Sequence, residues 1–205
     1  PNVVSRYGSD IGALYDLATS HMYRISQWSM GNVMIIDRGI NIRHDYMEDY
    51  FGDRATSKGF ITLDELEKFF KSYKEKNPTN ANGAPVYPMT VVDARNFIYD
   101  FGQIFGIAEY YEKDQDAVGI YYTHEKMPDL IKTLNRWYNL GILDPEFAIN
   151  KLENVQSKLT SGSSIATLLH ESSLAEVNKA LEAEDEDSYM FSYYKITQQQ
   201  GVEAY

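Results

Sequence analysis

The sequence predicts a helix-rich α/β fold, and three observations carry this prediction. Several stretches place apolar residues at helical spacing between recognisable start and stop signals. Shorter apolar or alternating stretches, rich in β-branched and aromatic residues, lie between them and are typical of strands buried under helices. The chain has 205 residues and is 43% hydrophobic, which suffices to bury a core in one sizeable domain or two small ones.

The helices are predicted where caps and periodicity agree. Thr62 and Glu65 form a capping box that opens a helix over 63–76, and Asn77-Pro78 ends it. Further helices are expected near 11–18, over about 91–105, from Pro128 to a left-handed C-cap at Gly141, and from Ser173, where Ser173 and Glu176 form a second capping box.

Five short strands are expected between these helices, at 32–36, 40–43, 86–89, 165–169 and 189–196. The segment 77–85 is rich in Asn, Pro and Gly and predicts a long turn. No internal repeat and no coiled-coil heptad is found. Strands that alternate with helices, with helix predominating, define the α/β class.

The charge of the chain excludes some partners. There are 19 basic and 30 acidic residues, which gives a net charge of −11. Such a chain repels phosphate backbones and anionic lipid headgroups, so we expect no nucleic acid partner. No apolar run is long enough to span a membrane, so no direct membrane insertion is expected. The same net charge disfavours strongly acidic ligands, unless a local group of arginines overrules it, such as Arg38, Arg43 and Arg95.

The signatures of catalytic and metal sites are missing from the sequence. There is no cysteine, no P-loop, no GxSxG and no GxGxxG, and no pair of histidines has metal-binding spacing. The turn at 77–85 lacks the carboxylates that a calcium loop requires. We therefore assign no catalytic residue, metal or cofactor, although two distant carboxylates that converge in the fold stay open as a hydrolytic pair.

Aromatic residues are the positive signal. The chain has 17 Tyr, 9 Phe and 2 Trp. Those at core spacing on predicted helices are expected to pack inside. The others are candidate platforms for sugar rings, because tyrosine offers an apolar face and a hydroxyl that still hydrogen-bonds in a wet cleft. They are Trp28, Tyr99, Tyr121, Tyr122, Tyr189, Tyr193 and Tyr194.

Four stretches, in order along the chain, resemble extracellular solute-binding proteins of bacterial ABC importers, namely the lipoprotein type (family 1-like) that handles carbohydrates in Gram-positive bacteria. They are IRHDYM at 42–47, the block from FITLDEL at 60–66 through KEKNP at 74–78 to YPMT at 87–90, LNRWYNLGILDPEF at 134–147, and KLTSG at 158–162. The likeness covers roughly residues 22 to 170. Each motif also has a local cause, so the specificity lies in the co-linear set.

The resemblance implies a type II periplasmic-binding-protein-like fold, with two α/β lobes that close on a ligand. That family is about twice this length or more, so this chain is expected to be an internal fragment with most of one lobe plus crossing segments. Residues 1–54 would end the first lobe and cross over, 55–187 would form the second lobe, and 188–205 would be the returning strand. We expect the cleft where strands end and helices begin. The candidate contacts there are Trp28, Thr90, Asp93, Arg95, His170 and Glu171. Thr90 or Asp93 could instead cap the helix, and Glu171 could be a solvated loop acid.

The implied function is to bind an oligosaccharide or other sugar and deliver it to a permease, without chemistry. The implied partners are the membrane permease and the ATPase, and the protein is expected to be a monomer. It would be extracellular and anchored to the cell membrane as a lipoprotein. A peptide ligand stays open. Two other functions also stay open: a non-catalytic surface interaction module and a carbohydrate-active enzyme.

Overall fold

The computed structural model describes residues 39–56, 61–107, 110–114, 117–169, 171–184 and 191–197. All of them belong to one of the two units into which the chain divides, Arg38–Tyr205. The predicted helix near 11–18 and the predicted strand at 32–36 lie outside the described residues.

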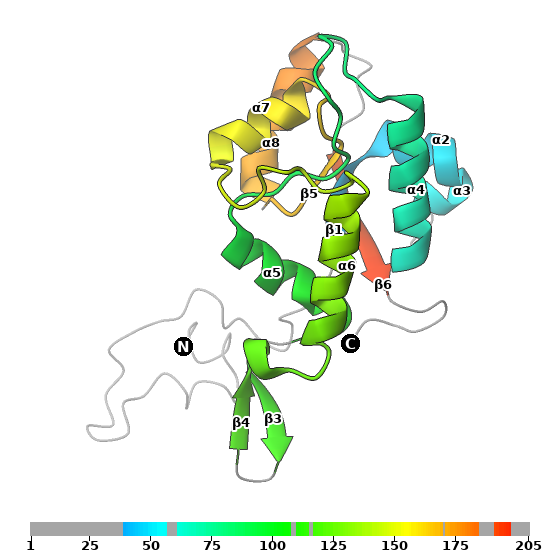
Figure 1. Cartoon of the computed structure of the whole chain (residues 1–205). Helices are drawn as coiled ribbons and strands as arrows, with labels where there is room; N and C mark the ends of the chain where they lie inside the picture. The colour runs from blue at the N-terminus through cyan, green and yellow to red at the C-terminus, as the bar shows by residue number, and fades with distance from the viewer. Residues whose placement is uncertain are drawn as a thin grey trace, which may run out of the picture. The chain divides into compact units, whose positions relative to one another are not determined.

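The described residues form a helix-rich α/β structure, which confirms the predicted class (Figure 1). The helices are α2 (His44–Phe51), α3 (Asp53–Thr56), α4 (Leu63–Lys76), α5 (Ala94–Gly102), α6 (Met127–Asn139), α7 (Leu152–Thr160) and α8 (Glu171–Glu184), with short 3₁₀ turns η2 (Gln103–Phe105) and η3 (Tyr121–Thr123). The strands are β1 (Gly39–Arg43), β2 (Ile61–Thr62), β3 (Tyr110–Asp114), β4 (Ala117–Ile120), β5 (Ala166–Thr167) and β6 (Phe191–Thr197).

The larger sheet joins strands from distant parts of the sequence, in the order β2-β6-β1-β5. β1 is antiparallel to both neighbours, with Asn41 opposite Tyr193 on β6 and opposite Thr167 on β5. β2 runs parallel to β6. β3 and β4 form a separate antiparallel hairpin, which lies at the end of α5 and α6 away from α7 and α8 (Figure 1).

Helix α4 forms where its sequence predicts. The Thr62 hydroxyl accepts the N–H of Glu65, and the Glu65 carboxylate accepts the N–H of Thr62, so the capping box closes in both directions. Its apolar face is buried in the main core: Leu63, Leu66, Phe69, Phe70 and Tyr73.

The main core is centred on large aromatic side chains. Trp137 of α6 is fully buried, and its ring lies 5.6 Å from that of Phe70 and 5.2 Å from that of Phe101, in edge contacts. Phe69, Phe97, Phe101 and Trp137 are therefore packing residues, as their spacing predicts. The same spacing also predicts a buried Tyr138, and this is wrong, because Tyr138 is 46% exposed. A smaller apolar cluster packs α7 against α8 and β6; it comprises Val155, Leu159, Leu169, Leu174, Val177, Leu181 and Phe191.

One predicted strand is wrong. Residues 86–89 form no regular strand, and only Met89 makes isolated parallel bridges, to Leu143 and Ala166. The physical reason is Pro88, which has no N–H to donate to a ladder. Its carbonyl still accepts from Ile165 and Ala166.

The helix start predicted at Ser173 is also displaced. α8 begins at Glu171, so Ser173 lies inside the helix rather than at its cap. The C-cap predicted at Gly141 is confirmed, because this glycine has φ of 63° and its N–H donates to the carbonyl of Tyr138.

Candidate functional site

Thr90 lies where the sequence predicts a strand end, but it faces the interior. Its exposed fraction is 0%, its N–H donates to the carbonyl of Ala166, and its hydroxyl donates to Asp144 at 2.8 Å. Thr90 thus connects the loop after Met89 to the segments that contain Ala166 and Asp144. Contact with a ligand stays a prediction for this residue.

Asp144 is the centre of a buried polar network that we call the strand-end network: Thr90, Asp144, Asn150 and Lys158. Its carboxylate accepts from Asn150 at 2.8 Å and from Lys158 at 2.7 Å. Lys158 also donates to Asn150 at 3.0 Å and to the exposed Glu146 at 2.6 Å. Every charge in this network therefore has a partner, as a buried charge requires.

The pKa values of Asp144 and Lys158 are both shifted in the direction that keeps the two groups charged. Burial by itself would raise the pKa of Asp144, but hydrogen bonds from Lys158 and Asn150 outweigh burial, and the pKa is lowered. Burial opposes the charge of Lys158, yet the bonds to Asp144 and Glu146 raise its pKa. Both groups are held ionised, which suits a structural tie rather than proton transfer.

Asp93 lies at the start of α5 in an unusual backbone conformation. It is the one described non-glycine residue with positive φ, 38°, and its carbonyl accepts the N–H of Phe97. Asp93 thus immediately precedes the helix, and both its capping of α5 and its contact with a ligand stay predictions. Burial, and then the nearby charge of Asp93, raise the pKa of Asp100 two turns later on α5.

The other predicted contacts are placed only in part. Arg95 lies in the first turn of α5 and Glu171 is the first residue of α8, but the side chains of these two residues are not described. Trp28 and His170 lie outside the described residues. The structure therefore brings Thr90 and Asp93 to one end of α5, and the other four contacts stay predictions.

Three of the tyrosines that the sequence leaves as sugar platforms gather in one place. The rings of Tyr121 and Tyr122 lie 3.8 Å apart, and Tyr99 of α5 makes an edge contact with Tyr121 at 5.7 Å. Tyr122 is 55% exposed, so its ring is open to a ligand. Tyr194 is instead buried and pairs its hydroxyl with His44. Tyr189 lies outside the described residues, and nothing is assigned to the Tyr193 side chain.

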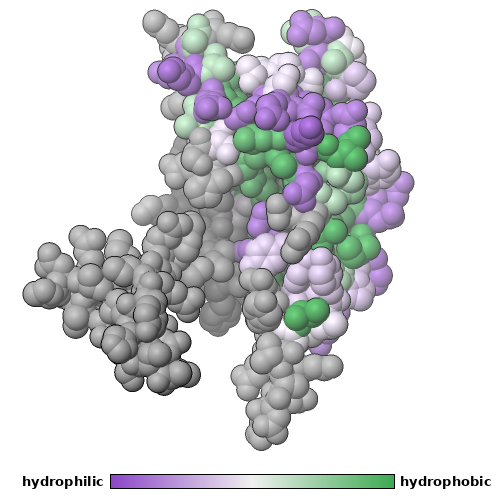
Figure 2. All heavy atoms as spheres, turned by 90° about the vertical axis from the view of Figure 1, so that its left-hand side faces the viewer, coloured by the Kyte–Doolittle hydropathy of each residue, from purple (hydrophilic) through white to green (hydrophobic). Residues whose placement is uncertain are grey.

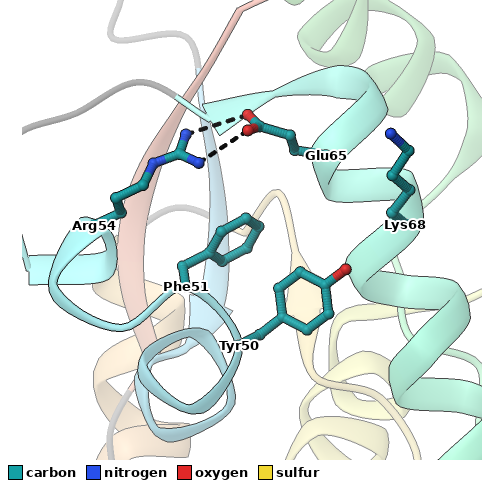
Figure 3. Close-up of a pocket in the computed structure, with 5 residues that line it drawn as sticks. All are labelled: Tyr50, Phe51, Arg54, Glu65 and Lys68. Carbon is teal, nitrogen blue, oxygen red and sulfur yellow. Dashed lines mark hydrogen bonds and ion pairs between the residues drawn. The ribbon is translucent and has the colours of Figure 1, made fainter.

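The sequence did not anticipate a surface pocket between α2, α3 and α4, which we call the α2–α4 pocket. Its volume is 310 Å³, and it is lined by Tyr50, Phe51, Arg54, Glu65 and Lys68 (Figure 3). The Arg54 guanidinium makes a two-pronged ion pair with the Glu65 carboxylate, at 2.9 and 3.3 Å. The pairing joins residues on different helices, so no local motif announces it.

Elsewhere on the surface, apolar and hydrophilic residues are interspersed. On the face shown in Figure 2, hydrophobic patches lie between strongly hydrophilic ones. Within the described ranges, no three His, Asp or Glu residues come together in a way that could hold a metal ion. Among the helices of the same residues, none has the length and hydropathy needed to cross a membrane.

Comparison with known proteins finds structural likeness but no matching sequence family. Neither a protein-family model nor a curated protein sequence matches the chain. The crystal structure of the alginate-binding protein AlgQ2 without calcium ion is similar, with a TM-score of 0.45 and 20% identity, over 63% of this chain and 26% of that one. This chain therefore spans about a quarter of that protein.

Proposed function

We propose that this chain is part of the extracellular substrate-binding component of an ABC importer. The full-length protein would bind an oligosaccharide or other sugar between two lobes and deliver it to a permease that an ATPase drives. The fold proposed for it is type II periplasmic-binding-protein-like, and the chain is proposed to be an internal fragment of a monomeric lipoprotein.

One observation carries the proposal: the motifs that resemble this family contact one another. Lys74, in the second motif, donates to the carbonyl of Gly141, in the third, at 2.6 Å. Asp144, also in the third, accepts from Lys158, in the fourth, at 2.7 Å. The N–H of Arg43, in the first, donates to the carbonyl of Ile165, just after the fourth.

These contacts answer the objection that each motif has a local cause. A capping box, a C-cap glycine and an Asp-Pro turn each form without reference to the others. Local causes alone predict no hydrogen bonds between segments that are 14 and 67 residues apart. The motif residues instead hold one scaffold together, which supports treating them as one set.

The sugar ligand is supported by the aromatic and carboxylate groups around α5. Tyr122 presents an open ring, backed by Tyr121, for the apolar face of a sugar. Asp93 and Asp100 are half-buried carboxylates of the kind that accept hydrogen bonds from sugar hydroxyls. Closure of two lobes would stabilise the bound state through contacts from both sides.

The test is calorimetric binding of an oligosaccharide panel to the full-length protein, with glycan products analysed in parallel. We expect saturable binding without turnover. Tyr122→Ala should weaken it about fivefold, and Tyr138→Ala, which removes another exposed tyrosine, from α6, should leave it unchanged. Absence of affinity for every oligosaccharide and peptide would overturn the proposal, and product formation would favour an enzyme.

A further inference from the structure

The α2–α4 pocket is small and has an aromatic wall. A volume of 310 Å³ lies at the lower end of the range for ligand sites, roughly 300–1,000 Å³, and suits a single ring rather than an extended chain. The Tyr50 ring makes edge contacts with Phe51 at 4.8 Å and with Phe69 at 5.3 Å. Because Phe69 is 2% exposed, this wall is anchored in the main core.

The carboxylate in the pocket is already occupied. The Oε2 atom of Glu65 accepts from Arg54, from the Thr62 N–H and from the Thr62 hydroxyl, and its Oε1 atom accepts from Arg54. The Arg54 hydrogen bond lowers the pKa of Glu65 to about 2, so the pair stays ionised and its charges cancel. Glu65 therefore offers little to a ligand.

The Lys68 ammonium is the charged group of the pocket lining that is still available to a ligand. Lys68 is exposed, and it has no hydrogen bond or ion pair with any residue that the structure describes. The nearby Glu67 is engaged by Arg136 and Trp137, each at 2.8 Å. The lining of the pocket thus carries one net positive charge, on a chain whose net charge is −11.

The hydrogen-bonding groups of the pocket select an acceptor. Lysine and arginine only donate, and a tyrosine hydroxyl can do either. Figure 3 shows the Tyr50 hydroxyl directed toward α4, and Lys68 extends from α4 with its ammonium pointing away from that hydroxyl. A fitting ligand presents a carboxylate to Lys68, an apolar ring face to Tyr50, and hydroxyls to the Tyr50 hydroxyl.

We propose that the α2–α4 pocket binds a single hexuronic acid unit. The carboxylate pairs with Lys68, and the ring packs against Tyr50. This inference rests on the five lining residues and is independent of the proposed transport role. The net charge of −11 does not exclude such a ligand, because the residues that line the pocket carry a net positive charge. Arg43, which the sequence offers as a group for an acidic ligand, is instead paired with Asp45 at 2.6 Å.

Titration of the intact chain with three probes, followed by calorimetry or NMR, tests the proposal. D-glucuronate should bind, and D-glucose, which differs only by a CH₂OH in place of the carboxylate, should bind at least about fivefold more weakly. Cyclohexanecarboxylate keeps the charge and ring but lacks the hydroxyls, and it should also bind more weakly. Equal binding of either analogue would overturn the assignment to a uronic acid.

Two lysine variants locate the binding. Lys68→Gln should weaken glucuronate binding about fivefold, whereas Lys71→Gln, which changes an exposed lysine of the same helix outside the pocket lining, should have no effect. Tyr50→Leu, with an unchanged melting temperature as the folding check, should also weaken it. Equal effects of the two lysine variants, or none, would overturn the proposal. The proposed transport function is tested separately, by oligosaccharide binding and its loss in Tyr122→Ala. Absence of glucuronate binding at the α2–α4 pocket would therefore overturn only the present proposal.

Discussion

At the scale of single residues, the strand-end network explains how a charge is tolerated inside this protein. Asp144 is 2% exposed, and three neighbouring side chains and the N–H of Glu146 donate to its carboxylate. Such a group stabilises the fold only while its partners are in place, because an unpaired buried charge is far more costly than an exposed one. Glu146 contacts the same lysine but is largely exposed, and it provides a comparison within one cluster.

Asp144→Asn should destabilise the protein by about 2 kcal/mol, because it removes the charge that faces Lys158 in the interior. Glu146→Gln removes the other partner of the same lysine, and it should change the free energy of unfolding by less than about 1 kcal/mol, since exposed pairs contribute little. Urea denaturation of both variants measures the difference. Equal losses would contradict a special role for burial.

Acid provides a second measurement on the same variant. The folded-state pKa of Asp144 is lowered, so its contribution is present above the unfolded pKa, about 3.9, and is lost as the pH falls through the folded value. The free energy of unfolding should therefore decline below about pH 4 in the parent chain. The decline should be shallower in Asp144→Asn, where that group no longer titrates.

At the scale of elements, the sequence predicts those structures whose cause is local. The capping box at Thr62 gives the start of α4 correctly, and Pro128 and Gly141 bracket α6. Helix α2 has no side-chain cap and only eight residues, so nothing local marks it. The strand predicted at 86–89 is wrong because the prediction followed the apolar pattern, whereas Pro88 has no N–H to donate to a neighbouring strand.

The candidate sites follow the same division. The tyrosines at 121 and 122 could be singled out from the sequence because they sit outside helical core spacing, and the structure brings Tyr99 to them. The α2–α4 pocket could not be predicted, because it needs Arg54 to reach Glu65, eleven residues along the chain, and needs the unpredicted α2 to supply Tyr50. Tertiary contacts, not local patterns, create it.

Gly83 and Gly141 both have positive φ, and substituting each with alanine distinguishes the cost of backbone strain from the cost of steric crowding. A Cβ at Gly83 would meet nothing, whereas a Cβ at Gly141 would collide with the Nζ of Lys74. Gly83→Ala should destabilise the chain by about 1 kcal/mol, from the positive φ alone. Gly141→Ala should cost about 1 kcal/mol more, because it also displaces the bond from Lys74 to the Gly141 carbonyl.

Thermal melting of the two glycine variants and of Gly141→Ala combined with Lys74→Met tests the cause of the difference. If the collision with Lys74 is responsible, adding the lysine substitution should cost the Gly141→Ala protein less than it costs the parent chain. Identical costs in the two backgrounds would show that backbone strain alone accounts for both glycines.

At the scale of the whole described structure, the main sheet is built from both ends of the described chain. β1 begins at Gly39 and β6 ends at Thr197, yet they are paired along five residues. β6 also lies between β1 and β2, and it is the only strand that pairs with β2 among the described residues. Of the described strands, β1 and β5 pair directly, but β2 joins them only through the last strand, β6.

Removal of β6 should therefore unfold the sheet rather than trim an edge. A chain that ends at Glu184 loses the pairing of β1 and β2 with β6 and exposes the surface that buries Phe191, Tyr194 and Ile196. Burial of three such side chains contributes more than about 5 kcal/mol, which is comparable with the stability of a small domain. We expect this chain to show no cooperative thermal transition by circular dichroism. A chain that ends at Thr197 keeps every described pairing and should melt like the parent, so two truncated chains with the same melting temperature would contradict a central role for β6.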